Sequence, residues 1–253
     1  MAHFPFAGAA VSRGLRPWRS AGHSQQGRAR ARNEDAFLDC PQRGCWAVAD
    51  GMGGYRHGDV ASQWVVSSLA ELSAQGGLDR RVGAVRRRLQ DVNQRLGDAR
   101  VEPDTGSHVT MGSTVVALLL ENGRAACLWA GDSRCYLWRQ QSLYLLSRDH
   151  SLQQRLMDER QLSPMQARAH PDARALTRAV GARSPLHLEV LELSTRPGDV
   201  FLLCSDGLYQ ALSHGDLGCA LSVDAPQHAV DQLFARALRR PTQDDLTAVV
   251  VRS

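Results

Sequence analysis

The chain has 253 residues and a mass of 27.7 kDa, and 43% of its residues are apolar, which is enough to bury one large core. Its 30 basic and 26 acidic residues nearly balance, and few aromatic residues accompany the scattered basic ones, so a nucleic-acid-binding surface is not indicated. The chain contains no lysine, which excludes Schiff-base chemistry, pyridoxal phosphate and the lysine of a phosphate-binding P-loop.

The six cysteines have no Cys-x-x-Cys spacing, and several lie in apolar runs. We therefore expect reduced core cysteines in a cytoplasmic protein, rather than disulfides or zinc ligands. No stretch approaches the roughly 20 apolar residues that span a bilayer, so no membrane association is expected. Residues 1–20 carry their arginines after the apolar residues, the wrong order for a signal peptide. We expect 1–20 to be a loose extension and 21–253 to be a single domain.

In the first half of the chain, three short strands are predicted over residues 19–25, 36–40 and 45–49. The third is an apolar run that we expect to stop where Asp50 leaves it, before Gly51-Met52-Gly53-Gly54. Apolar residues then recur at steps of three and four from 58 to 72 and from 82 to 96, which predicts two amphipathic helices. The second helix carries arginines that we assign to a solvated face: Arg80, Arg81, Arg86, Arg87 and Arg88. Residues 98–110 are predicted to form a loop.

The second half of the chain is richer in predicted strands. They cover 113–120, 124–130, 134–138, 143–146, 187–193, 200–204 and 246–251, and Asn122-Gly123 is a hairpin-turn sequence. Ser151 is expected to cap a helix that runs to about 160, Pro164 starts a shorter helix, and 226–238 forms a third. Because strands and helices occur in separate runs, the pattern favours an α+β fold in which antiparallel sheets pack together and helices lie outside.

Acidic residues recur at the ends of apolar runs, and Asp244-Asp245 stand at the start of the last one. One such Asp-Gly pair is usually only a turn, but here the arrangement repeats along the chain. The acidic residues at these ends are Asp50, Asp132, Asp206, Asp244 and Asp245. A further segment places Arg28, Arg30 and Arg32 directly before Glu34 and Asp35.

If these carboxylates converge, they need a cation among them, because each one raises the pKa of its neighbours. Oxygen donors without histidine or cysteine at ligand spacing favour Mg²⁺ or Mn²⁺ over Zn²⁺, and no calcium-binding loop sequence is present. Two such ions bridged by a carboxylate would activate a shared water for in-line attack on phosphorus. With an arginine to hold the phosphate oxygens, the pattern indicates a phosphate-ester hydrolase.

Eight motifs between residues 20 and 252 also occur, in the same order, in a known family. They are Arg30-Ala31-Arg32-Asn33-Glu34-Asp35-Ala36, Asp50-Gly51-Met52-Gly53-Gly54, Gly112-Ser113-Thr114, Ala130-Gly131-Asp132-Ser133-Arg134, Arg148-Asp149-His150-Ser151, Leu176-Thr177-Arg178-Ala179-Val180-Gly181, Cys204-Ser205-Asp206-Gly207-Leu208 and Asp244-Asp245-Leu246-Thr247. At these motifs the chain resembles the metal-dependent protein serine/threonine phosphatases of the PP2C type (the PPM family), particularly the small bacterial regulatory members.

The resemblance implies an αββα sandwich, in which two antiparallel β-sheets are flanked by helices and two Mn²⁺ or Mg²⁺ ions bind at one end of the sheets. The implied metal ligands are Glu34, Asp50, the backbone carbonyl of Gly51, Asp132, Asp206 and Asp244. By analogy Asp50 bridges the two ions, and Asp206 and Asp244 complete the first site. Glu34 and Gly51 support the second site, and Asp132 joins Asp206 around a third, weaker ion.

The resemblance also implies roles for residues that are not ligands. Arg30 matches the phosphate-binding arginine and, with Asp50 and Asp206, is an implied catalytic residue, although Arg28 and Arg32 compete for its role. Asp35 and Asp245 are expected behind the ligands. Where the usual motif has Asp-Asn, Asp245 adds a charge that either tightens metal binding or is exposed. Residues from about 152 to 174 match the family's flap beside the cleft, which is expected to influence substrate choice.

The chain departs from the family at two places near the active-site motif. Met52 occupies the position of the eukaryotic histidine that is thought to act as general acid, so another group must protonate the leaving oxygen. Tyr55 follows the double glycine where many bacterial members have histidine, and we interpret His57 as a surface residue. His150 and His170 are expected to make structural hydrogen bonds.

The resulting hypothesis is metal-dependent hydrolysis of phosphoserine and phosphothreonine in proteins, by direct attack of a water that bridges the metal ions. The expected partners are phosphorylated proteins, namely a bacterial serine/threonine kinase and its substrates, and the enzyme is expected to be a monomer. The alternative is a pseudophosphatase that binds phosphoproteins without catalysis. It is less favoured because every expected metal ligand is present.

Overall fold

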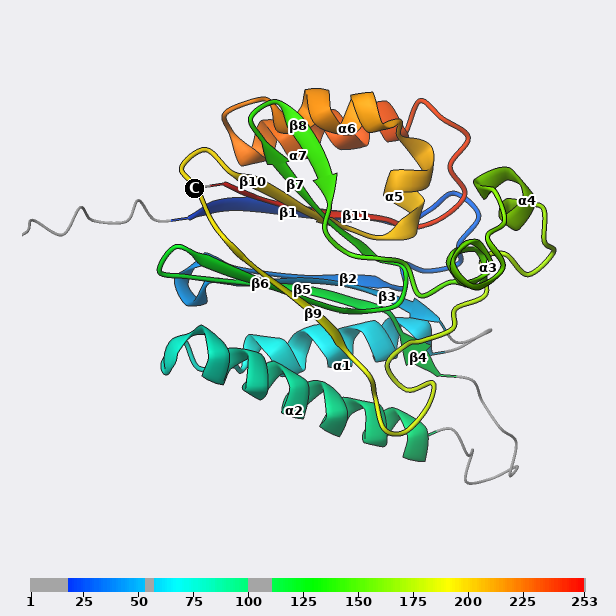
Figure 1. The fold of residues 1–253 in the computed structure, drawn as a ribbon, viewed down its shortest axis with the longest axis horizontal. Coiled ribbons are helices and arrows are strands. Elements are labelled where there is room, and N and C mark those ends of the chain that lie inside the picture. The colour runs from blue at the N-terminus through cyan, green and yellow to red at the C-terminus, as the bar shows by residue number, and fades with distance from the viewer. Residues whose placement is uncertain (1–17, 53–56, 100–110, 253) are drawn as a thin grey trace, which may run out of the picture.

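The computed structural model describes residues 18–52, 57–99 and 111–252. Two antiparallel sheets pack face to face, with helices on the outer side of each (Figure 1). The predicted α+β class and the αββα arrangement are therefore confirmed. Arg19 and Ser20, which the expected extension included, are the first two residues of the first strand. Residues 1–17, Gly53-Gly54, Tyr55 and most of the predicted 98–110 loop lie outside the described residues.

The first sheet has five strands, and all neighbouring strands are antiparallel. In spatial order they are β1 (Arg19–Gln25), β11 (Leu246–Arg252), β10 (Val200–Cys204), β7 (Arg134–Arg139) and β8 (Ser142–Leu145). The second sheet has the order β2 (Asp35–Cys40), β3 (Cys45–Met52), β5 (Val115–Glu121), β6 (Arg124–Ala130) and β9 (Glu189–Ser194), and the short β4 (Gly112–Ser113) pairs with the end of β3. The Asn122-Gly123 turn joins β5 to β6, as predicted.

The helices form two outer layers and a separate pair at one end of the sheets (Figure 1). Helices α1 (Gly58–Ala70) and α2 (Gly77–Asp98) cover the second sheet. The first sheet is covered by α5 (Asp206–Ala211), α6 (His214–Leu221) and α7 (Pro226–Ala237). Residues 152–174, which the resemblance assigns to a flap and which we refer to by that name, contain α3 (Leu152–Arg160) and α4 (Pro164–Arg168). A 3₁₀ turn covers Pro41–Arg43. Among the described residues, no helix combines the length and apolar character needed to cross a bilayer.

The central strands are buried on both faces. In β3, Trp46 and Val48 pack in the layer between the sheets, whereas Ala47 and Ala49 pack against the helices over the second sheet. This division follows from the alternation of side chains along a strand. Strands buried on both faces appear in the sequence as continuous apolar runs.

The prediction of core cysteines holds for Cys45, Cys127, Cys135 and Cys204, which are buried, but it is wrong for Cys219, which is exposed. Cys127 and Cys135 lie in the layer between the sheets.

Strand β3 is longer than predicted. The expectation that the strand stops before Asp50 is wrong, because pairing continues through Met52. Asp50 pairs with Asp35 of β2, and Gly51 and Met52 pair with β4. The predicted 113–120 strand is in fact two strands, separated at Thr114. The reason is that β3 changes partner from β5 to β4 at this point.

Helices α5 and α6 were not predicted. Their sequence, from Asp206 to Leu221, contains three glycines, which lower helix propensity and hide the apolar spacing. A local signal for α6 was nevertheless present. Ser213 and Asp216 form a capping box, in which each side chain bonds the backbone N–H of the other residue.

The expected solvated face of α2 contains one buried exception, Arg81. Its side chain donates hydrogen bonds to the carbonyl oxygens of Gly44 and Leu120, at 3.1 and 3.4 Å, and to that of Arg43. It also lies 3.9 Å from the carboxylate of Glu121. The prediction that Arg81 is solvent-exposed is therefore wrong. Its side chain is buried because it bonds to carbonyl groups at the start of β3 and near the end of β5.

Candidate active site

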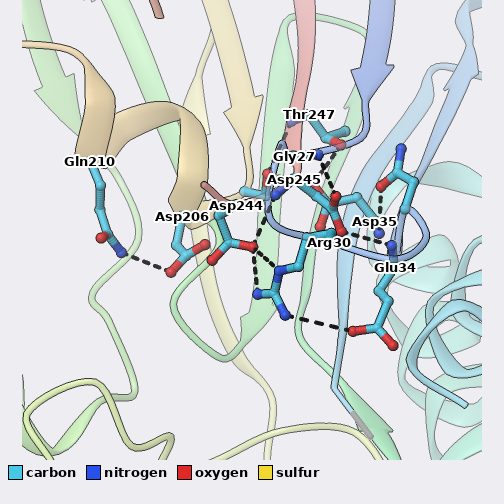
Figure 2. Close-up of polar contacts among 11 residues, drawn as sticks. Gly27, Arg30, Glu34, Asp35, Asp206, Gln210, Asp244, Asp245 and Thr247 are labelled. Atoms are coloured by element: carbon cyan, nitrogen blue, oxygen red, sulfur yellow. Dashed lines mark hydrogen bonds and ion pairs between the residues drawn. The ribbon is translucent and has the colours of Figure 1, made fainter. Parts of the chain in front are cut away.

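Five acidic residues from separate parts of the chain line one cavity of about 660 Å³ at the flap end of the sheets. Glu34 comes from the β1–β2 loop, and Asp132 lies in the turn between β6 and β7. The others are Asp50 near the end of β3, Asp206 at the first residue of α5 and Asp244 just before β11. The predicted convergence of these side chains on one cavity is therefore present, and Figure 2 shows Arg30 between Asp244 and Glu34.

The strand alternation explains why the carboxylates lie between the sheets. Asp50 continues the row of Trp46 and Val48, which faces the layer between the sheets. Asp35 continues the equivalent row of β2 and reaches the opposite sheet. One oxygen of its carboxylate accepts hydrogen bonds from Ser205 Oγ at 2.7 Å and Thr247 Oγ1 at 2.6 Å. Asp35 therefore stands behind the cavity and ties the two sheets together.

The backbone around Asp50 is held by short polar side chains. The Asp50 N–H donates to Thr114 Oγ1 at 3.0 Å, and Ser113 Oγ donates to the Asp50 carbonyl at 3.1 Å. Gly51 is required by its packing, because a Cβ there would lie 1.9 Å from the carbonyl oxygen of Gly58. Only glycine permits this close approach of β3 to the start of α1.

Glu34 lies at the same contact between β3 and α1. Its carboxylate accepts a hydrogen bond from the backbone N–H of Gly58, the first residue of α1. A helix N-terminus is a favourable place for a carboxylate, because the backbone N–H groups there lack partners within the helix. Partial burial nevertheless raises the pKa of Glu34, and the nearby Arg30 acts in the opposite direction.

The acidic side chains destabilise one another's charged forms. Burial, followed by repulsion from Asp35, Asp206, Asp132 and Asp244, holds the pKa of Asp50 well above its usual range. Burial and the neighbouring Asp206 raise the pKa of Asp132 to about 8, and burial raises that of Asp35 to about 7. The pKa of Asp206 is raised by burial and by Asp244, and it is lowered by Arg174 and Arg30. A bound cation would relieve this repulsion.

Arg30 is the arginine of its segment that contacts the acidic cluster. Its Nε and Nη2 atoms donate to Asp244 Oδ1 at 2.8 and 2.5 Å, and Nη1 lies 4.0 Å from Glu34 Oε2. Arg32 also lines the cavity but pairs with Asp59 at 3.0 Å. Arg28 is exposed and is not among the residues that line the cavity. Of the three competing arginines, Arg30 therefore has the geometry best suited to hold phosphate there.

Asp245 is buried and faces away from the cavity. Its Oδ1 accepts a hydrogen bond from Gly27 N, and its Oδ2 accepts one from Glu34 N, both at 2.8 Å. These bonds fix both ends of the segment that carries Arg30 (Figure 2). For Asp245 we considered either tighter metal binding or an exposed position, and the exposed position is wrong because the residue is buried. The residue lies behind the acidic cluster, as expected, and positions the arginine segment.

The donor set fits hard divalent cations. It offers carboxylate oxygens whose mutual repulsion a cation would offset, and no histidine or cysteine is among the residues that line the cavity. In the described part of the chain, however, no three histidine, cysteine, aspartate or glutamate side chains are grouped so that they could hold an ion as they stand. The bond between Arg30 and Asp244 accounts for this in part. Asp244, one of the expected metal ligands, is directed toward the Arg30 guanidinium and is therefore not grouped with the other carboxylates.

Sequence reasoning missed three residues of the site. Thr114, in a motif that had been assigned no role, orients Asp50. Gln210 of α5 donates to Asp206 Oδ2 at 2.7 Å, and Arg174 from the flap lines the cavity. Nothing in the local sequence distinguishes Arg174 from the other exposed arginines. Gln210 could be recognised only once residues 206–211 were known to form a helix, in which positions four apart face each other.

His150 and His170 make structural hydrogen bonds, as expected. His150 Nδ1 accepts from Gly131 N at 3.1 Å, and its Nε2 lies 3.1 Å from Glu189 Oε1. This pairing holds the turn that carries Asp132. His170 Nδ1 accepts from Asp172 N at 3.1 Å within the flap.

A family model described as protein phosphatase 2C matches residues 21–251, which is most of the chain. The chain belongs to the protein phosphatase 2C family. Curated relatives include the serine/threonine protein phosphatase PstP of Mycobacterium tuberculosis, which is 34% identical over 92% of this chain. The chain spans only 44% of the length of PstP. The serine/threonine phosphatase stp of Listeria monocytogenes is 30% identical, and the match covers 90% of this chain and 93% of that protein.

Solved structures of phosphatases share the fold of this member of the protein phosphatase 2C family. PppA, a key regulatory component of T6SS in Pseudomonas aeruginosa, has a TM-score of 0.83 and 42% identity, covering 93% of this chain and 97% of PppA. The catalytic domain of PstP in complex with two manganese ions has a TM-score of 0.80 and 32% identity, covering 93% of this chain and 97% of that one.

Proposed function

We propose that this protein hydrolyses phosphoserine and phosphothreonine in proteins, with the help of two divalent cations. The observation that carries the proposal is the set of five acidic side chains around one cavity with Arg30 at its edge. Family membership and the manganese-bound relative support the same chemistry. The pseudophosphatase alternative is less favoured, because all five expected acidic ligands line the cavity.

In this proposal Asp50 would contribute to both cation sites, Asp206 and Asp244 would hold one cation, and Glu34 and the Gly51 carbonyl would help to hold the other. Asp132 joins Asp206 around a third cation. Bound Mn²⁺ or Mg²⁺ lowers the pKa of a water to give a nucleophile and offsets charge on the phosphate. Arg30 exchanges Asp244 for the phosphate oxygens, because its planar guanidinium matches them in a bidentate fork.

Hydrolysis of a phosphothreonine peptide with Mn²⁺, with Mg²⁺ and with EDTA tests this function. We expect activity with either metal and none with EDTA. Asp206→Asn and Asp244→Asn should each lower kcat/KM by at least about a hundredfold, since each removes one charged ligand. The matched control is Asp231→Asn on the exposed side of α7, which should retain full activity. Tight phosphopeptide binding without turnover under any metal would instead establish the pseudophosphatase.

The setting in the cell is part of the same proposal. We infer a cytoplasmic, monomeric phosphatase that opposes a serine/threonine kinase and acts on that kinase and its substrates. The free cysteines agree with a reducing compartment. The resemblance to PppA, named as a regulatory component of T6SS, supports a regulatory rather than a metabolic role. Loss of the gene should raise phosphorylation of a co-expressed kinase, and unchanged phosphorylation would contradict this assignment.

A further inference from the structure

A second cavity, of about 630 Å³, adjoins the acidic one. The two cavities share Ala29, Arg30, Arg174 and Asp244 as a common wall. The rest of the second cavity is lined by residues of α5 and by the segment between α7 and β11. These residues are Gly207, Gln210, Ala211, Arg240, Pro241, Thr242 and Gln243. We call this space the side cavity. A group bound in it would lie next to the phosphate site.

The side cavity is basic. Three arginines and one aspartate line it, which gives a net charge of +2. Arg30 and Asp244 bond each other, so the excess charge comes from Arg174 and Arg240. Arg174 is exposed and lies close enough to Asp206 in the acidic cavity to lower the pKa of that carboxyl, but its guanidinium makes no hydrogen bond with the residues that the structure describes. Arg240 is 61% exposed, and its ion-pair neighbour among the described residues is Asp216 at 4.0 Å. Both guanidinium groups can therefore receive an anion.

The two arginines come from independent parts of the fold. Arg240 follows the end of α7, where a cation is favourable beside the helix C-terminus whatever its other role. That explanation does not extend to Arg174, which lies in the flap segment after α4. Gln243 and Thr242 contribute further polar groups to the wall. Convergence of these groups on one space matches the chemistry of phosphate or carboxylate recognition by arginine.

We propose that the side cavity binds an anionic side chain of the substrate, either a second phosphorylated residue or an acidic one, close in sequence to the phosphorylated residue that is hydrolysed. This inference rests on the proposed function and defines its substrate class. Because the two cavities share a wall, we expect the two anionic residues to be near neighbours in an extended peptide, in which each residue spans roughly 3.4 Å. Arg174, at the shared wall, faces both.

Matched phosphothreonine peptides test this proposal. One series carries alanine at every flanking position, and the others carry aspartate or phosphoserine at single positions up to about three residues away on either side. We expect at least one anionic position to raise kcat/KM about tenfold through a lower KM, since hydrogen bonds between charged groups are of that strength. A preference for phosphoserine alone identifies a second phosphate as the ligand. An equal preference for aspartate identifies any acidic residue.

Two variants connect the preference to the side cavity. Arg240→Gln should reduce the ratio of kcat/KM between the anionic and alanine peptides toward one, and Arg240→Glu should favour a peptide with arginine at the same position. Arg239→Gln is the matched control, because Arg239 is the adjacent exposed arginine and does not line the cavity. Thermal unfolding of each variant confirms that the fold is retained.

The outcomes separate this inference from the proposed function. If the alanine peptide is hydrolysed and no anionic position raises kcat/KM, the side-cavity proposal is wrong and the phosphatase assignment stands. If no peptide is hydrolysed, the phosphatase assignment fails. The side-cavity proposal is then tested without catalysis, by measuring the binding of the same peptides, fluorescently labelled, by anisotropy in EDTA. Tighter binding of the anionic peptide that is lost in Arg240→Gln supports it, and equal binding of both peptides overturns it.

Discussion

The bond between Arg30 and Asp244 predicts that metal binding competes with an ion pair within the protein. Two donors of one guanidinium contact the same carboxylate oxygen, at 2.8 and 2.5 Å. The side chains are 43% and 34% exposed, so solvent screens the pair and its contribution is about 1 kcal/mol. A cation that takes Asp244 as ligand must first displace Arg30. Arg30→Ala should therefore tighten Mn²⁺ binding about fivefold, since 1.4 kcal/mol corresponds to a tenfold change.

Isothermal titration of the EDTA-treated protein with MnCl₂ measures this effect without relying on catalysis. Arg28→Ala is the control, because Arg28 belongs to the same exposed segment but does not line the cavity, and its Mn²⁺ affinity should equal that of the wild type. The same Arg30→Ala protein should show a higher KM for a phosphopeptide, since it loses the arginine that we propose binds the phosphate. Equal or weaker Mn²⁺ binding by Arg30→Ala would refute the competition.

Three further predictions concern stability. For the metal-free protein, the free energy of unfolding should fall as pH rises from about 4 to 7, by up to about 1.4 kcal/mol per pH unit for each proton. The sign follows because the pKa of Asp35 is raised from 3.8 to about 7, so the folded state binds more protons than the unfolded state in this range. Asp35→Asn should flatten this slope in urea titrations at each pH, and an unchanged slope would contradict the assignment. Leu89→Ala, at a fully buried position of α2, should cost about 2–5 kcal/mol, whereas Leu191→Ala on the exposed edge strand β9 should cost under about 1 kcal/mol. Ser213→Ala removes the capping box of α6 and should cost about 1 kcal/mol by the same assay, and no loss would show that the cap is not needed.

Strands and hairpins were predictable because their signals are local. Apolar runs bounded by turn residues located β6, β10 and β11 to within about one residue. The Asn122-Gly123 turn fixed the pairing of β5 with β6. The acidic residues at the ends of several apolar runs, with Glu34 after the arginines, predicted the site before any geometry was known. This worked because a cluster of carboxylates implies a cation wherever its members meet.

Features that depend on a partner from elsewhere in the chain were not predictable in this way. Arg81 is buried because three carbonyl groups surround it at the start of β3 and the end of β5. Asp245 is a support for the arginine segment because Gly27 and Glu34 present their N–H groups to it. The spacing of apolar residues indicates whether a segment forms a helix or a strand, but it does not indicate which residues from other segments will contact it.

The sequence by itself therefore determined the fold class and the acidic composition of the cavity, and it predicted a hard metal ion, since each follows from residue type and local spacing. Only the tertiary structure decided which arginine contacts the acidic cluster, which aspartate turns away from it and that Arg174 and Arg240 share a cavity beside it. These contacts join residues up to 218 positions apart, and the pairing of β1 with β11 within the first sheet brings the arginine segment beside Asp244 and Asp245.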